Sequence, residues 1–196
     1  MAKTVKPILK LKTSTEDLRL HAPSVWVIDS ISKNFTMDRL VTGQTYAMDG
    51  QIRSLQISSG LIKASVMCTE ERPYRLEIDT PVLSSDDWTK VSQRMAGESR
   101  IAARLSAGKI PSNLARMMED CGLDAFADNL IVRCGCKDKK PCKHAAAALF
   151  LTAQRLLASP LLYFQIRGTD KDDLLLKLRQ ARTLDAKGEA RAHANI

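Results

Sequence analysis

The sequence predicts an α+β fold, in which an antiparallel β-meander is followed by a helical region and then by a small ββα-like finger. Three observations predict this fold. From about Gln44 to residue 80, apolar and polar residues alternate with the period of two that half-buried strands have. From residue 84 onward, apolar residues recur at helical spacing. Finally, three of the five cysteines and one of the three histidines lie between residues 134 and 144, which is typical of a small metal-binding unit.

Residues 1–22 are expected to form a flexible basic arm, because four lysines precede the first acidic residue, Glu16. Residues 23–82 are expected to form the β-rich meander. Within this range, a short amphipathic segment around Trp26 and Ile31 has helical spacing and precedes the strands.

Three runs of the meander have the pattern of strands: GQIRSLQIS, GLIKASVMC and PYRLEIDT. Asp49-Gly50 and Ser59-Gly60 suit tight turns between strands. An antiparallel arrangement therefore follows. The residues of the second run that share one face are Ile62, Ala64, Val66 and Cys68, and those of the third are Tyr74, Leu76 and Ile78.

Residues 83–128 are expected to form helices. Ser84 or Ser85 can cap the first helix, because acidic residues follow in its first turn. Pro111 can open a second helix, and Gly122 can end it. The apolar side chains at helical spacing are expected in the core rather than at a cofactor; they are Trp88, Val91, Met95, Ala102, Leu105, Leu114, Met117, Met118 and Cys121.

Residues 129–182 are expected to form the finger together with C-terminal helices. NLIVRC has the pattern of a short strand, and KHAAAALFLTAQRLLA that of a strong helix that ends at Ser159-Pro160. Gly168 interrupts the chain before a last amphipathic helix. Residues 183–196 are polar and rich in alanine, and we expect them to form a flexible tail.

The cysteine cluster has the spacing Cys-x-Cys-x5-Cys-x-His, formed by Cys134, Cys136, Cys142 and His144. Three thiolates and one imidazole satisfy the tetrahedral coordination that zinc prefers. Two cysteines on an ideal strand at this spacing would point to opposite faces, so the strand must turn there, and Gly135 permits the turn. Because four protein ligands leave no open position, one structural Zn²⁺ is expected, whose binding stabilises the fold of residues 131–150.

A [2Fe–2S] centre is the alternative occupant, since three cysteines and one histidine also hold such a cluster in a compact iron–sulfur class. In that class three residues separate the last cysteine from the histidine, whereas here only Lys143 does. Mixed Cys/His ligation of iron–sulfur clusters is otherwise uncommon. Zinc is therefore favoured over an electron-transfer cluster.

The chain is basic, with a formal net charge of +8 and a pI near 9.4. Two explanations remain open for the basic residues around the cluster. They can offset the negative charge of a zinc ion with three thiolates, or they can contact nucleic-acid phosphates. These residues are Arg133, Lys137, Lys139, Lys140 and Lys143.

Several functional classes find no support in the sequence. It has no P-loop, no G-x-G-x-x-G and no G-x-S-x-G, so we do not expect an enzyme. No apolar run approaches the roughly 20 residues that span a bilayer, and the N-terminus lacks the features of a secretory signal. A cytoplasmic location without membrane contact is expected.

The signature Cys134-x-Cys136…Cys142-x-His144, followed by AAAALFLTAQRL, resembles a SWIM zinc finger. The similarity covers about residues 40–180: a G-x-I hairpin, a YR-x-x-I strand, an LS-x-x-x-W cap and an F-x-x-RG tail occur in the order found in bacterial SWIM proteins, which are often encoded beside Swi/Snf-type helicase-like ATPases. The chain departs from that group in lacking a Trp- and Gly-rich opening and in having a short, lysine-rich loop between the ligand pairs.

The resemblance implies a zinc ion on these four residues. It also implies a role in DNA binding or protein interaction, with a Swi/Snf-type ATPase as the partner to expect. The first functional hypothesis is therefore a zinc-stabilised adaptor that contacts DNA, protein or both. The alternative is a pure protein-interaction subunit that docks through PLLYF, with Tyr163 and Phe164, and through Leu174, Leu175 and Leu178, unless these side chains pack on the zinc-site helix instead.

Overall fold

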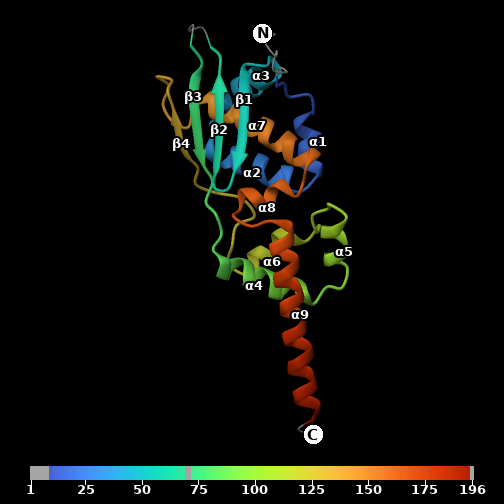
Figure 1. Ribbon diagram of the computed structural model, residues 1–196. Helices are drawn as coiled ribbons and strands as arrows, with labels where there is room; N and C mark the ends of the chain where they lie inside the picture. The colour runs from blue at the N-terminus through green and yellow to red at the C-terminus, as the bar shows by residue number, and fades with distance from the viewer. Residues whose placement is uncertain (1–8, 69–71, 195–196) are drawn as a thin grey trace, which may run out of the picture.

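The computed structural model of the protein describes residues 9–68 and 72–194, arranged in the two parts that Figure 1 shows one above the other. The upper part is a four-stranded sheet with helices on one face, and the lower part consists of helices. The strands are β1 (Ile52–Ser58), β2 (Leu61–Val66), β3 (Tyr74–Asp79) and β4 (Ile131–Cys134). The helices are α1 (Thr15–Leu20), α2 (Ser24–Asn34), α3 (Met37–Met48), α4 (Ser85–Ala96), α5 (Ile101–Ser106), α6 (Leu114–Glu119), α7 (Lys143–Ala158), α8 (Leu162–Ile166) and α9 (Lys171–Ala194).

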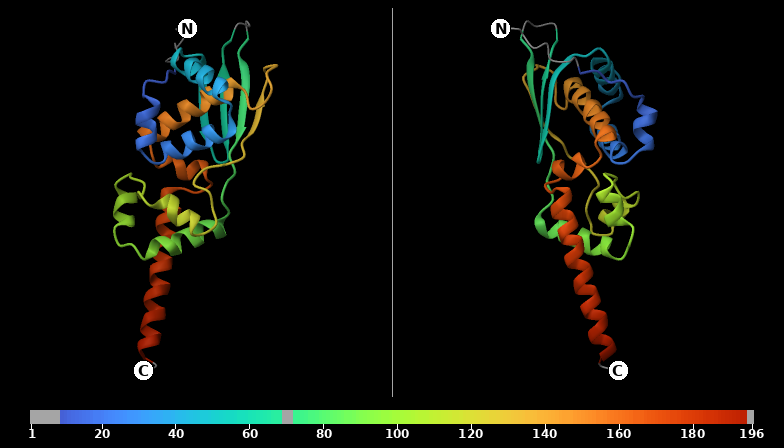
Figure 2. Two further views of the ribbon diagram at one scale, coloured as in Figure 1. Left: turned by 180° about the vertical axis from the view of Figure 1, so that it is seen from behind. Right: turned by 45° about the vertical axis from the view of Figure 1, so that its right-hand side comes forward.

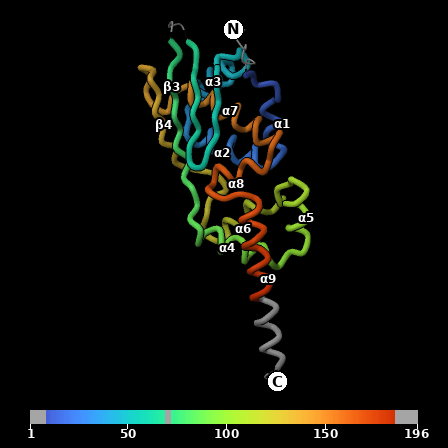
Figure 3. Tube along the Cα trace, in the orientation of Figure 1, coloured from blue at the N-terminus to red at the C-terminus, as the bar shows by residue number. Residues whose placement is uncertain are grey.

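The sheet has the strand order β1-β2-β3-β4, and every neighbouring pair is antiparallel. After β3 the chain continues into the lower part and then returns to the sheet as β4, as Figure 3 shows. Leu76 pairs with Cys134 and Ile78 with Val132, so the last strand joins the meander in one sheet. The predicted α+β class and antiparallel meander are confirmed.

Helix α7 lies at the centre of the upper part, between the inner face of the sheet and helices α2 and α3 (Figure 2). Its residues from His144 to Ala153 are all buried, which explains why it is apolar around its whole circumference. Small side chains let α3 come close: a Cβ on Gly43 would stand 2.6 Å from the Cβ of Ala146 and 2.9 Å from the carbonyl oxygen of Lys143. The run of alanines is therefore a packing requirement as well as a helix-forming one.

The N-terminal region differs from the expected flexible arm. Residues 1–8 of that arm lie outside the described residues. From residue 9 onward the prediction is wrong, because Leu11 and Leu18 are buried in the core and α1 is capped by Ser14, whose hydroxyl accepts a hydrogen bond from the Asp17 backbone. Gln154 of α7 holds the segment through the backbone of residues 10, 12 and 13.

Residues 24–34 and 37–48 are helical, although they lie in the range that was expected to be β-rich. The amphipathic segment around Trp26 is α2, as its spacing indicates. Helix α3 was not predicted, because its buried side contains Gly43 and Ala47 while Met37, Val41 and Met48 are exposed. Its apolar residues therefore do not mark the face that it buries.

The lower part begins with α4, which has the predicted cap: the Ser84 hydroxyl accepts from the Asp87 backbone, and the Asp87 carboxylate accepts in return from the backbone of Ser84. Helix α6 begins at Leu114, three residues after the proline expected to open it. Helix α9 extends to Ala194, so residues 183–194 are helical where a flexible tail was expected over residues 183–196; residues 195 and 196 lie outside the described residues. This helix packs on α4 and α5 rather than on the zinc-site helix.

The aromatic residues that the docking alternative relied on are core residues. Tyr163 and Phe164 of α8 are completely buried, and the Phe164 ring lies 5.7 Å from that of Trp88 in a T-shaped contact. Leu174 and Leu178 are buried too. Of the two interpretations left open for these side chains, docking and packing inside the protein, the structure favours packing for these four.

The two parts are joined by Arg167, which is 3 % exposed. Its backbone carbonyl accepts hydrogen bonds from the Trp88 indole and from the Leu83 backbone. Its guanidinium donates to the carbonyl oxygens of Pro81, at 2.6 Å, and Asp124, at 3.1 Å. The LS-x-x-x-W and F-x-x-RG segments, about 80 residues apart in sequence, thus meet at the junction. None of the helices in the described ranges is long and apolar enough to cross a membrane.

Candidate metal centre

The sheet positions the first ligand of the cluster. Cys134 ends β4 opposite Leu76, whose side chain is buried on the inner face of the sheet. The backbone N–H of Gly135 still donates to the carbonyl of Arg75, at 3.1 Å, one residue beyond the strand. The chain turns after this bond, which brings Cys136 to a buried position next to Cys134. The predicted turn between the two cysteines is present.

The start of α7 positions the other two ligands. Cys142 is the N-cap residue, and His144 lies in the first turn. The carbonyl oxygen of Pro141 accepts a hydrogen bond of 2.7 Å from Arg39 of α3, which ties the loop to that helix. Because α7 is the central helix of the upper part, both ligands are fixed to its core.

The ligand atoms of Cys134, Cys136, Cys142 and His144 all lie within 4.8 Å of one another. In a tetrahedral site with Zn–S distances of about 2.3 Å, two sulfurs are separated by about 3.8 Å. The four groups therefore fit one zinc ion. All five cysteines lie in the described part of the chain, and none of them forms a disulfide. A two-iron cluster would distribute the ligands over two metal atoms, which so compact a group does not favour.

Burial makes uncompensated charge in the cluster costly. Cys142 is 0 % and His144 1 % exposed. A hydrogen bond from Cys134 lowers the pKa of Cys142, and the same contact raises the pKa of Cys134. Burial lowers the pKa of His144, but hydrogen bonding to Cys142 and Cys136 outweighs it and raises this pKa to about 9. A divalent cation would let all three thiols ionise beside a neutral imidazole.

Two of the five basic residues predicted around the site, Lys140 and Arg133, are engaged with groups of the protein, and the other three are more accessible. Lys140 donates to the sulfur of Cys136, at 3.2 Å, and to its carbonyl oxygen, at 3.0 Å. Arg133 lies at the exposed surface of the sheet and is paired with Glu77 and Asp79 of β3. Lys140 therefore offsets thiolate charge, and Arg133 belongs to a cross-strand ion-pair ladder.

The remaining three lysines are more accessible. Lys137 and Lys139 are exposed on the loop between the ligand pairs. Lys143 is half-buried, with its ammonium 5.4 Å from the centre of the Tyr46 ring and 3.8 Å from Asp138. Lys139 and Lys143 line a cavity of about 260 Å³ between the loop and α3, together with Arg39, Thr42, Asp38 and Asp138.

The side chains that surround His144 were not predicted from the sequence. The rings of Tyr46 and Tyr74 lie 5.5 and 5.3 Å from the imidazole, centre to centre. Tyr74 could have been found, because it shares the inner strand face with Leu76. Tyr46 and Arg39 gave no signal, since only the tertiary packing of α3 on α7 brings them to the site.

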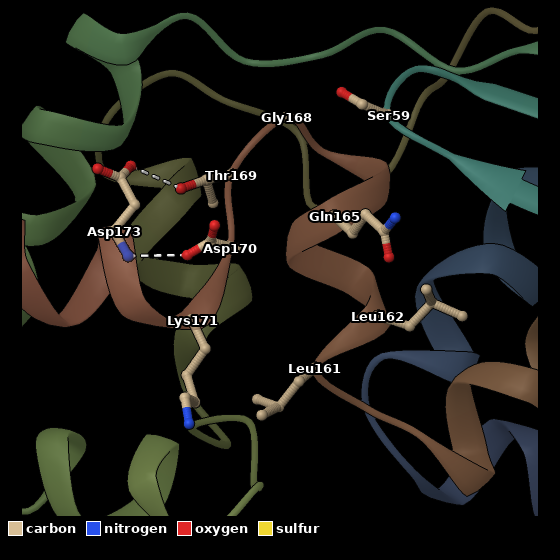
Figure 4. Close-up of a pocket in the computed structure, with 9 residues that line it drawn as sticks. All are labelled: Ser59, Leu161, Leu162, Gln165, Gly168, Thr169, Asp170, Lys171 and Asp173. Atoms are coloured by element: carbon tan, nitrogen blue, oxygen red, sulfur yellow. Dashed lines mark hydrogen bonds between the residues drawn. The ribbon is translucent and has the colours of Figure 1, made fainter.

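A second hollow, of about 700 Å³, lies far from the cluster, between α8 and the start of α9 (Figure 4). Asp170 accepts hydrogen bonds there from the backbone of Asp172 and Asp173, and the Thr169 hydroxyl donates to Asp173. These polar groups cap α9, and they include no nucleophile with an adjacent base.

Comparisons with known proteins agree with this centre. Residues 120–152 match the family model described as SWIM zinc finger. The chain is also 35 % identical over 161 residues to the protein named "Uncharacterized protein Rv2102" of Mycobacterium tuberculosis (strain ATCC 25618 / H37Rv), a match that covers 80 % of this chain and 58 % of that protein. The chain thus spans less than two thirds of the relative's length. No solved structure matches it. The finger's four ligand residues are positioned to bind one zinc ion.

Proposed function

We propose that the chain, which carries a SWIM zinc finger at residues 120–152, is a non-enzymatic adaptor that contacts the phosphate backbone of DNA through this finger. The observation that carries the proposal is that the side chains of Lys137 and Lys139 are exposed and not neutralised by an acidic partner in the described part of the chain. Both are exposed on the loop that the metal ligands anchor, and neither makes an ion pair with any residue that the structure describes. Exposed, unpaired cations on a fixed loop are suited to bind phosphates.

The neighbouring cavity supports the same proposal. Three cations, Arg39, Lys139 and Lys143, line it together with the carboxylates of Asp38 and Asp138, so the lining has a net formal charge of +1. Arg133 and Lys140 are not among the proposed contacts, because both are engaged with partners inside the protein. With no aromatic platform on the loop, binding should depend on charge and show little sequence preference.

The metal supports a binding role rather than catalysis. Three thiolates and one imidazole fill a tetrahedral zinc ion, which leaves no position for water or substrate. Zinc here would hold the loop and the first turn of α7 together, and the lysines would act as fixed charges on that support.

A salt titration of DNA binding by fluorescence anisotropy tests the proposal. The zinc-loaded chain should bind a short duplex at about 50 mM salt, and the double variant Lys137→Glu/Lys139→Glu should bind at least tenfold more weakly. The slope of log K against log salt concentration should also be smaller in magnitude by about two for the double variant. Arg104→Glu/Lys109→Glu is the matched control, because it reverses the same number of charges at exposed positions of the lower part. Equal affinities for both variants would contradict the proposed contact. Millimolar binding by the wild type would leave the pure protein-interaction alternative.

We also propose a Swi/Snf-type helicase-like ATPase as the protein partner, on the strength of the family resemblance. Its contact would lie outside Tyr163 and Phe164, which are buried. Size-exclusion chromatography of the purified chain mixed with such an ATPase tests this pairing. Co-elution supports it, and separate elution at micromolar concentrations of both proteins contradicts it.

A further inference from the structure

His144 presents its two ring nitrogens to different surroundings. Nδ1 lies 3.9 Å from the sulfur of Cys134 and so faces the other ligands. Nε2 is buried and has no partner with hydrogen-bond geometry among the described residues. When Nδ1 binds a metal, the neutral imidazole carries its proton on Nε2, and a buried N–H without an acceptor destabilises the site. The centre therefore needs an acceptor close to this nitrogen.

Cys68 is the candidate that the structure places nearby. It follows β2 by two residues, is half-buried, and has its sulfur 3.4 Å from the hydroxyl of Tyr46. The Tyr46 ring itself packs against the His144 imidazole in a T-shaped contact. Tyr46 thus contacts both residues and holds them on one side of the centre.

We propose that Cys68 is a positioning residue of the zinc centre, whose sulfur accepts the Nε2–H of His144 while the Tyr46 hydroxyl holds that sulfur in place. Outer partners of this kind fix the tautomer and the orientation of a metal-bound histidine, and their loss typically weakens metal binding 10- to 100-fold. The role explains why a cysteine that is neither a ligand nor part of a disulfide lies beside the cluster. It rests on the zinc centre and is independent of the proposed DNA contact.

The competing possibility is that water takes this role. Tyr46 and Cys68 line a cavity of about 490 Å³ beside α3, together with Val41, Thr42, Thr45, Asp49 and Gln51. A water molecule in that cavity could accept the Nε2–H without any help from sulfur. The test must therefore separate a sulfur acceptor from a water acceptor.

Zinc affinity, measured by competition with a chromogenic chelator, gives the first readout. Cys68→Ala should weaken zinc binding at least tenfold, whereas Cys68→Ser, which keeps an acceptor, should stay within about threefold of the wild type. Cys121→Ala is the matched control, since Cys121 is another half-buried cysteine but lies in the lower part. An affinity of Cys68→Ala equal to that of the control would overturn the proposal.

The second readout is the imidazole of His144 in long-range ¹H–¹⁵N spectra of the zinc-loaded protein. The wild type and Cys68→Ser should show the Nε2–H tautomer with slow exchange against water, and Cys68→Ala should show rapid exchange. Zinc bound to Nε2, or an Nε2–H equally protected in Cys68→Ala, would overturn the proposal. If Cys68→Ala does not fold, Cys68→Val, which removes the acceptor but fills the space of the side chain, replaces it in both measurements, with the same expected and contradicting results.

Discussion

At the scale of single residues, Gly43 shows how tightly the helix that carries two zinc ligands is packed. A Cβ at this position would lie 2.6 Å from Ala146 and 2.9 Å from the carbonyl oxygen of Lys143, the residue between the ligands Cys142 and His144. Neither neighbour is the flexible end of a long side chain. The first turn of α7 therefore has to move if position 43 gains a side chain.

We expect Gly43→Ala to lower the free energy of unfolding by about 2 kcal/mol, in the range of overpacked cores, and to weaken zinc binding as well. Urea unfolding and chelator competition measure the two effects. Gly97→Ala is the control, because a Cβ there meets nothing within 4 Å and the backbone φ is –64°; its stability should stay within about 0.5 kcal/mol or rise. A neutral Gly43→Ala would mean that α3 and α7 are not in close contact.

The zinc ligands could be predicted residue by residue because their spacing is local. Two ligands on each side of a short loop specify the site without knowledge of the rest of the fold. The partners of the ligands could not be predicted in this way. Tyr46 and Arg39 reach the site from a helix about 100 residues earlier, and the choice of Lys140 over its neighbours as the partner of the Cys136 sulfur depends on how the loop folds back.

At the scale of elements, the ladder on the outer face of the sheet gives Arg133 its role. Lys63, Glu77 and Arg133 lie side by side on β2, β3 and β4, and Arg133 also pairs with Asp79. Hydrogen bonding to Arg133 lowers the pKa of Asp79, whereas the pKa of Glu77 is lowered first by Lys63. A lowered folded-state pKa gives a contribution to stability that is present above the unfolded-state value and lost as the pH falls through the folded-state value.

We expect Arg133→Met to return the pKa of Asp79 toward the ordinary value of 3.8 while that of Glu77 stays low. Carboxyl ¹³C titrations of both proteins measure this, over the pH range in which the amide spectrum shows a folded sheet. Glu77 is an internal control, because its main partner, Lys63, is unchanged. An Asp79 pKa that does not move would show that the pairing is absent in solution.

The elements themselves were predictable where one face alone is buried. Alternation located β1, β2 and β3, and the capping box located α4, because in each case the pattern is visible within a few residues. Helix α3 was missed because a glycine and an alanine form its buried side. The N-terminal arm could not be predicted from its charge, because the burial of Leu11 and Leu18 is what orders the segment from residue 9 onward.

At the scale of the whole molecule, Arg167 couples the sheet and the lower helices. Its guanidinium is buried and donates to two backbone carbonyls, on the segments that lead into and out of the lower part. Gly168 follows with φ of +89°, and a Cβ there would stand 3.0 Å from Val82. The F-x-x-RG segment noted in the sequence therefore has a structural role, which is to hold the sheet and the lower helices together.

Replacing Arg167 by methionine should lower the free energy of unfolding by about 2 kcal/mol, because two charge-assisted, part-buried hydrogen bonds to backbone carbonyls are lost. The affinity for zinc should stay unchanged. Arg179→Met, at an exposed position of α9, should stay within about 0.5 kcal/mol of the wild type. Urea unfolding and chelator competition separate the two properties. Loss of zinc affinity in Arg167→Met would contradict the assignment to Arg167 of a role confined to connecting the two parts.

The most direct test of the account is the metal content of the purified chain by elemental analysis, for the wild type, Cys142→Ser and the control Cys121→Ser. We predict one zinc per chain and no iron in the wild type and the control, and no bound zinc in Cys142→Ser, because the remaining three ligands cannot close the tetrahedron with comparable affinity. A wild type that contains iron with sulfide, or a Cys142→Ser chain that keeps its full zinc, would contradict the assignment of the centre to Cys134, Cys136, Cys142 and His144.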